Sequence, residues 1–143
     1  MIFDMQSLFS DAQAVTTTAA STNVIDLGAT GTLVGGSVPL KRDLGAGGPV
    51  CLRTQVSKTF TGLTSLKVGI EVSDNEDFSS GVTTVAESAA VAAADLVAGY
   101  VFPPQYMPQG VNKRYVRLKY TVVGTATAGE MTAGIVCGDQ TNG

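Results

Sequence analysis

The stretch from residue 114 to residue 137 constrains the fold most, because its hydrophobic pattern has a period of two. Val116, Leu118, Tyr120 and Val122 would lie on one face, opposite Tyr115, Arg117, Lys119 and Thr121; after Gly124 the alternation resumes with Met131, Ala133, Ile135 and Cys137. Successive side chains of a strand point to opposite faces of a sheet. The pattern therefore predicts two antiparallel strands, each with one buried and one solvent-facing side.

Further strands are predicted upstream, at residues 14–20, 22–27, 50–57, 66–73 and 81–89. The clearest is 66–73, in which Leu66, Val68, Ile70 and Val72 would face the core while Lys67, Gly69, Glu71 and Ser73 would face outward. The alanine-rich segment 91–97 fits a short helix or a loop. Short strands separated by turn signals favour a β-sandwich or a barrel, so we expect an all-β protein.

Two irregular segments interrupt these strands. Residues 28–49 hold many glycines and two prolines, which excludes a regular helix and predicts a loop on the surface. Residues 101–112 hold three prolines and predict a semi-rigid connection. The glycine-rich run at 45–50 (GAGGPV) lacks the last glycine of a dinucleotide-binding fingerprint and leads into a strand, so no cofactor site is expected there.

Composition excludes much chemistry. The 143 residues fit one domain, residues 13–143, preceded by residues 1–12 as an N-terminal arm or first strand. Histidine and tryptophan are absent, which removes the commonest general base and metal ligand and the usual platform for stacking a sugar. The net charge of −3 argues against a nucleic-acid partner. No apolar run is long enough for a membrane span, and the N-terminus lacks the basic region of a secretory signal.

No catalytic, cofactor-binding or metal-binding residues are therefore predicted, and we do not expect an enzyme. The acidic turn at residues 74–77 could hold Ca²⁺, although Asp and Asn are also ordinary turn residues. Cys51 and Cys137 have no CxxC neighbour and are predicted to be buried thiols, unless their strands are adjacent and permit a disulfide.

Two groups of residues are candidate contacts with another protein. The first is basic and is either the solvated face of a strand or a strip that meets an acidic partner: Lys113, Arg114, Arg117 and Lys119. The second is apolar and either packs on the domain's own core or docks on a neighbouring subunit: Ile2, Phe3, Met5, Leu8 and Phe9.

Four segments resemble the capsid cement, or decoration, proteins of tailed bacteriophages, in particular the jelly-roll type known from a Bordetella phage. They are FSDAQAVTTTAASTNVIDLG (9–28), KRDLGAGGPVCLRTQV (41–56), SLKVGIEVSDNEDF (65–78) and RYVRLKYTVVGTATAGEMTAGIV (114–136). The resemblance covers nearly the whole chain and rests on patterns of small and β-branched residues.

The resemblance implies a single-domain jelly-roll β-sandwich of short antiparallel strands, with a Gly-rich loop and an extended N-terminal segment. It implies a virion protein, made in the host cytoplasm, that binds the outer surface of an icosahedral head. There it would hold together major capsid subunits of the HK97-like fold, generally as a dimer, without cofactor, nucleic acid or membrane. Small outer-face residues, among them Gly69, Thr132 and Gly134, would let another chain approach closely.

The alternative is a carbohydrate- or receptor-binding module of a phage particle, because jelly rolls often serve as lectin-like domains. The absence of tryptophan argues against this alternative.

Overall fold

Two strands of 22 residues, β4 (Leu52–Ser73) and β7 (Tyr115–Val136), pair antiparallel along their length and form the centre of the fold. The computed structural model describes residues 3–138, and all of its remaining strands flank this pair. They are β1 (Phe3–Ala14), β2 (Ala19–Ala20), β3 (Ile25–Asp26), β5 (Thr83–Glu87) and β6 (Val91–Ala92), with one 3-10 turn, η1 (Ala93–Asp95). The expectation of an all-β domain is confirmed.

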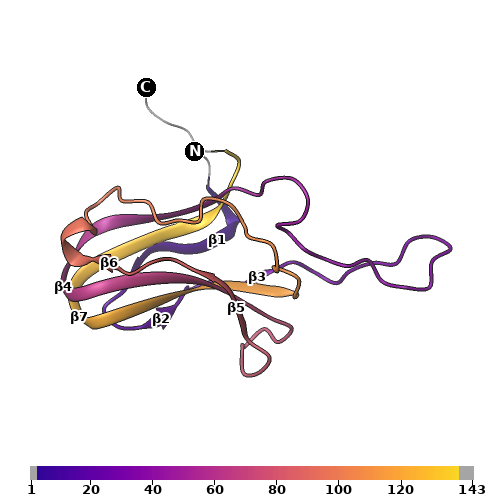
Figure 1. Cartoon of the computed structure of the whole chain (residues 1–143), viewed down its shortest axis with the longest axis horizontal. Helices are drawn as coiled ribbons and strands as arrows, with labels where there is room; N and C mark the ends of the chain where they lie inside the picture. The colour runs from indigo at the N-terminus through magenta and orange to yellow at the C-terminus, as the bar shows by residue number, and fades with distance from the viewer. Residues whose placement is uncertain (1–2, 139–143) are drawn as a thin grey trace.

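The β4–β7 ladder folds back on itself at its middle. Its register is regular from Leu52↔Ile135 to Val56↔Met131, shifts repeatedly, and becomes regular again from Ser65↔Val123 onward. Gly62, Gly124 and Gly129 lie in the shifted region with positive φ, a conformation that suits glycine and permits the bend. The two halves of the ladder therefore belong to two stacked layers, which Figure 1 shows one above the other.

Each layer has its own order of strands. In one layer β1 pairs with residues 130–136 of β7, which pair with residues 52–58 of β4; the bridges Cys51↔Tyr106 and Gln55↔Val101 add segment 101–106 at the edge. In the other layer β2 and β3 pair with the first half of β7, and β5 and β6 pair with the second half of β4. This alternation of strands between two layers is the arrangement of a jelly roll.

The core lies between the layers. The largest fully buried side chains come from both halves of the ladder and from the segments that flank it: Phe9, Leu66, Ile70, Leu96, Phe102, Leu118, Tyr120 and Met131. The inward positions predicted from the alternation are confirmed for Val116, Leu118 and Tyr120, and Val122 packs partly buried against the same core.

Pairing differs from the sequence-based prediction in two places. Residues 114–137 do not form a hairpin, because β7 is one bent strand whose halves pair with β4 rather than with each other. Likewise 50–57 and 66–73 are halves of one strand, β4, so the central strands are not short. The alternation reports which side chains share a face, but the paired residues of β4 and β7 are 42 or more positions apart in the sequence, from Ser73↔Tyr115 outward.

The smaller predicted elements are shortened. Strand 81–89 is confirmed as Thr83–Glu87, and 91–97 contains β6 and the single turn η1. Apart from Ala14, which ends β1, segments 14–20 and 22–27 contribute only the two-residue strands β2 and β3. Residues 1–12 are expected to form either an N-terminal arm or a first strand. From Phe3 onward they form the first strand, because β1 begins there and pairs with β7.

Two of the three small outer-face residues, Gly69 and Gly134, are covered by the chain itself, so the expectation that they lie open is wrong for them, whereas Thr132 is half-buried. A Cβ built on Gly134 would meet Ser7 O at 3.0 Å and the side chains of Phe3 and Leu8 at 3.1 and 3.2 Å. Gly69 is buried beside β5, with atoms of Thr84, Ala86 and Glu87 within 4 Å of a built Cβ.

A buried polar chain links β1 to β7 inside the core. Tyr120 Oη lies 2.7 Å from Ser10 Oγ, which donates to Gln13 Oε1 at 2.7 Å. Because the single Ser10 proton is used there, Tyr120 is the donor to Ser10. Gln13 then donates to Ala20 O at 2.9 Å and fixes β2. Burial raises the pKa of Tyr120 from 10.0 to about 12.

This raised pKa predicts an alkaline loss of stability. Between pH 10 and 12 the unfolded chain releases the Tyr120 proton while the folded protein keeps it, so the stabilisation is complete below pH 10 and falls as pH rises. At pH 11 the loss should be about 1 kcal/mol relative to pH 9. Urea denaturation of the wild type and of Tyr120→Phe at both pH values isolates this contribution by difference. Identical pH dependence in the two proteins would contradict it.

Candidate interaction surfaces

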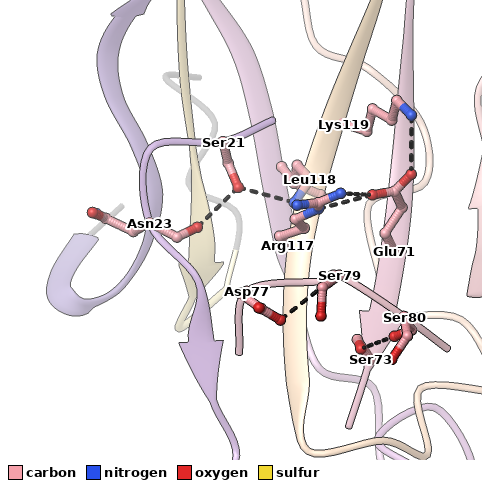
Figure 2. Close-up of polar contacts among 10 residues, drawn as sticks. All are labelled: Ser21, Asn23, Glu71, Ser73, Asp77, Ser79, Ser80, Arg117, Leu118 and Lys119. Atoms are coloured by element: carbon pink, nitrogen blue, oxygen red, sulfur yellow. Dashed lines mark hydrogen bonds and ion pairs between the residues drawn. The ribbon is translucent and has the colours of Figure 1, made fainter. Parts of the chain in front are cut away.

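Three charged residues of β4 and β7 form one ion cluster, shown in Figure 2. They lie in the layer that also contains β2, β3, β5 and β6. Glu71 lies directly across the ladder from Arg117, whose Nε and Nη2 are 2.8 and 2.7 Å from Glu71 Oε2. Lys119 Nζ is 3.5 Å from the other carboxylate oxygen, Oε1. The side chain of Glu71 is only 6% exposed and that of Arg117 is 21% exposed. The expectation that Glu71 faces solvent is therefore wrong.

The turn after β4 covers this cluster. Phe78 in this turn is buried, and the Arg117 guanidinium carbon lies 4.1 Å from the centre of its ring, a cation–π contact. Ser73, also predicted to face outward, is buried and donates to Ser80 O at 3.0 Å (Figure 2). The loop from 74 to 80 thus converts a solvent-facing strand surface into a small second core.

The acidic turn at 74–77 uses one of its carboxylates locally. Asp77 Oδ1 accepts from Ser79 N at 3.0 Å, and hydrogen bonds from Ser79 hold the pKa of Asp77 below its ordinary value. Over residues 3–138 no group of three or more Cys, Asp or Glu side chains is placed to hold a metal ion.

Arg114 belongs to a different pair. Its Nε and Nη2 donate to the two carboxylate oxygens of Asp26 in β3, at 2.8 and 2.7 Å. The hydrogen bond from Arg114, followed by one from Gly28 N, lowers the pKa of Asp26 to about 2, and the pair raises the pKa of Arg114. Both side chains are more than two-fifths exposed, so this pair fixes geometry more than it stabilises the fold.

Lys113 has a third set of partners. Its Nζ donates to Gly81 O and, at 3.0 Å, to Thr83 Oγ1 at the start of β5. The predicted basic group is therefore not one strip of unpaired charge, because each of its members already has a partner within the chain. Lys113 and Lys119 are half-buried, Arg114 is exposed and Arg117 is mostly covered.

The apolar N-terminal group divides between core and surface. Phe9 is fully buried in the core between the layers, and Leu8 is buried and lies over Gly134 together with the half-buried Phe3. These side chains are thus occupied by the domain's own packing. Met5 is 80% exposed and stays available for contact, whereas Ile2 lies outside the described residues.

A surface that the sequence reasoning did not single out is the loop after β3. We call residues 28–40 the arm; they leave the body of the molecule at the right of Figure 1. Four large aliphatic side chains of the arm are exposed: Leu33, Val34, Val38 and Leu40. The signal available in the sequence was an uncharged run, 27–40, that nevertheless contains several aliphatic residues.

The base of the arm is held firmly. Arg42 Nη2 donates to Leu27 O at 3.1 Å and to Gly28 O at 2.5 Å, which joins the two ends of the arm. Asp43 accepts from Gly110 N with both carboxylate oxygens, at 3.1 and 3.0 Å. A Cβ on Gly45 would lie 2.2 Å from the Pro108 carbonyl carbon, so backbone packs directly on backbone there.

The cysteines are both free thiols. Their strands are adjacent, since Val136 N donates to Cys51 O at 3.0 Å. Cys51 is half-buried, and Cys137 is exposed, which corrects the prediction of two buried thiols.

Two further observations concern the described range, residues 3–138. It contains no pocket, and none of its helical segments is long and apolar enough to cross a membrane.

Comparison with known proteins gives one result. The model of a protein family described as Bbp16 matches residues 9–135, which run from the middle of β1 almost to the end of β7. The match therefore includes both layers of the jelly roll and the arm. No curated protein matches the chain.

Proposed function

The chain belongs to the Bbp16 family, and on this premise we propose that it is a structural protein of a phage particle that cements the capsid. In this proposal it binds the outer surface of an icosahedral head and holds neighbouring major capsid subunits of the HK97-like fold together. Its working unit would be a dimer, and it would have no catalytic role. The observation that carries the proposal is the family match over residues 9–135.

The structure supports a passive binding role through its rigidity. The two long strands β4 and β7 join both layers in one ladder, and Arg117, paired with Glu71, holds the turn after β4 through its contact with the Phe78 ring. A body of this kind loses little conformational entropy when it binds, so more of the contact energy is available to hold subunits together.

The mechanism would be mass action. A protein that binds the assembled shell but not its separated subunits stabilises the shell by its binding free energy. At a free concentration one hundred times Kd, this is about 2.7 kcal/mol for each site. Repetition over many sites of the shell would multiply the effect.

The decisive experiment mixes the purified protein with expanded heads that lack it. We expect the protein to co-sediment with the heads and to raise the temperature at which they release DNA or disassemble. Heads alone, and heads mixed with an unrelated β-sandwich protein of similar pI, are the controls. If the protein neither co-sediments nor protects the heads, the cement proposal is wrong.

Two further measurements separate the remaining possibilities. The mass of the free protein in solution tests the proposed dimer. Specific binding on a glycan array, without binding to heads, would favour the carbohydrate- or receptor-binding alternative.

A further inference from the structure

The arm, residues 28–40, makes a hairpin that stands clear of the jelly-roll body (Figure 1). Thr32 bridges to Pro39, Leu40 N donates to Gly31 O at 2.9 Å, and Gly36 N donates to Leu33 O at 2.8 Å in the turn. Every residue from 29 to 41 is exposed. The arm therefore has a defined local shape while its side chains are left to solvent.

The chemistry of the arm is unusual for a surface hairpin. Residues 27–40 carry no charge, and four aliphatic side chains are concentrated within residues 33–40. Other exposed large apolar side chains come singly from separate segments of the body: Met5, Val82, Val97, Tyr106 and Val123. A concentrated, uncharged apolar surface of this kind matches a partner surface that is itself apolar and uncharged.

The direction of the arm is fixed from its base. Arg42 joins the carbonyls of Leu27 and Gly28, and Asp43 is hydrogen-bonded to Gly110 in the loop before β7. Each leg of the hairpin has about six residues, so its tip reaches roughly 20 Å from this base at 3.3 Å per residue. The tip of the arm therefore lies beyond the jelly-roll body, where it can contact a surface that the body does not cover.

A cement protein must contact two capsid subunits at once, and the arm provides an exposed apolar surface that is separate from the body. We propose that the arm is the second attachment point: Leu33, Val34, Val38 and Leu40 insert into an apolar, uncharged groove of the capsid subunit next to the one beneath the body. This inference rests on the proposed function and adds to it the element that spans the subunits. Linking two contacts in one rigid molecule strengthens both through a high effective concentration.

The test uses two variants of the full chain. In the first, residues 33–38 are replaced by Asn-Gly, a two-residue turn that keeps the Thr32–Pro39 pair. The second is Leu33→Ser/Val34→Ser. The matched control is Val97→Ser/Val123→Ser, which removes two exposed apolar side chains from the body. Binding to expanded heads lacking the protein is measured by co-sedimentation, the urea midpoint by circular dichroism and the solution mass by sedimentation equilibrium.

We expect both arm variants to bind heads at least about tenfold more weakly, because each buried aliphatic side chain contributes more than a tenfold change in affinity. Their urea midpoints and the binding of the control should equal those of the wild type. If the wild type binds heads and the arm variants bind equally well, the inference is wrong and the cement function stands. If the wild type binds no heads, the cement function itself is wrong. If the arm variants change the solution mass but not head binding, the arm joins two copies of this chain, and the inference is overturned.

Discussion

Gly129→Ala is expected to lower the free energy of unfolding by about 2–5 kcal/mol, or to prevent folding. Gly129 lies in the bend of β7 with φ of 145°, and a Cβ there would be 2.1 Å from Cδ1 of Phe60, which is buried in the bend of β4. Overpacking of a core costs about 1–3 kcal/mol, and a side chain at positive φ adds about 1–2 kcal/mol. Urea denaturation monitored by circular dichroism measures the loss.

Gly47→Ala is the matched control for this substitution. Gly47 is exposed, its φ is not positive, and a built Cβ meets no atom within 4 Å. Its effect should stay within about 0.5 kcal/mol. A Gly129→Ala protein with the wild-type midpoint would mean that Phe60 can leave its position without cost, and the described bend would be wrong.

Arg117→Met is expected to lower the free energy of unfolding by about 2–4 kcal/mol. It leaves the carboxylate of Glu71, of which 6% is exposed, with only the more distant Lys119, and it removes the cation–π contact with Phe78. Removing one partner of a buried ion pair costs about 3–5 kcal/mol, and the residual exposure and the remaining lysine reduce this figure. Chemical denaturation of the wild type and the variant measures the difference.

Two further variants test whether the loss of stability in Arg117→Met comes from the burial of the ion pair and from the charge that is left unpaired. Lys67→Met breaks the exposed ion pair with Glu87, whose nitrogen–oxygen distance is 3.2 Å, and should cost no more than about 1 kcal/mol. Glu71→Gln/Arg117→Met should recover part of the stability lost by Arg117→Met, because no unpaired charge then stays buried. An Arg117→Met loss no larger than that of Lys67→Met would show that the cluster behaves as an ordinary surface pair.

The alternation of hydrophobic residues correctly predicted which side chains of a strand face the core, but it did not predict which strands pair with each other. The alternation in residues 115–122 identified Val116, Leu118 and Tyr120 as buried, because the pleat of a strand depends only on the strand itself. It could not show that this strand continues through Gly124 and Gly129 to Val136, or that both halves pair with β4. A bend and its partner are set by contacts between segments distant in the sequence.

The candidate surfaces show the same division. Arg117 and Lys119 were identified as outward-facing positions, but only the folded turn around Phe78 buries the first against Glu71. Phe9 and Met5 have similar hydrophobicity and lie on the same strand, yet one is in the core and the other is exposed, because irregular pairing in β1 changes which side faces inward.

The sequence by itself determined that this chain is all-β, lacks the histidine chemistry of most hydrolytic sites, and resembles a phage protein, which the family match bears out. These conclusions follow from residue type and short-range periodicity. Only the tertiary structure decided that the basic residues are already paired, that Leu8 and Phe9 are buried, and that residues 28–40 project as an apolar arm. The physical reason is that exposure and charge pairing depend on which distant segments pack together, as when Asp43 and Gly110 fix the base of the arm.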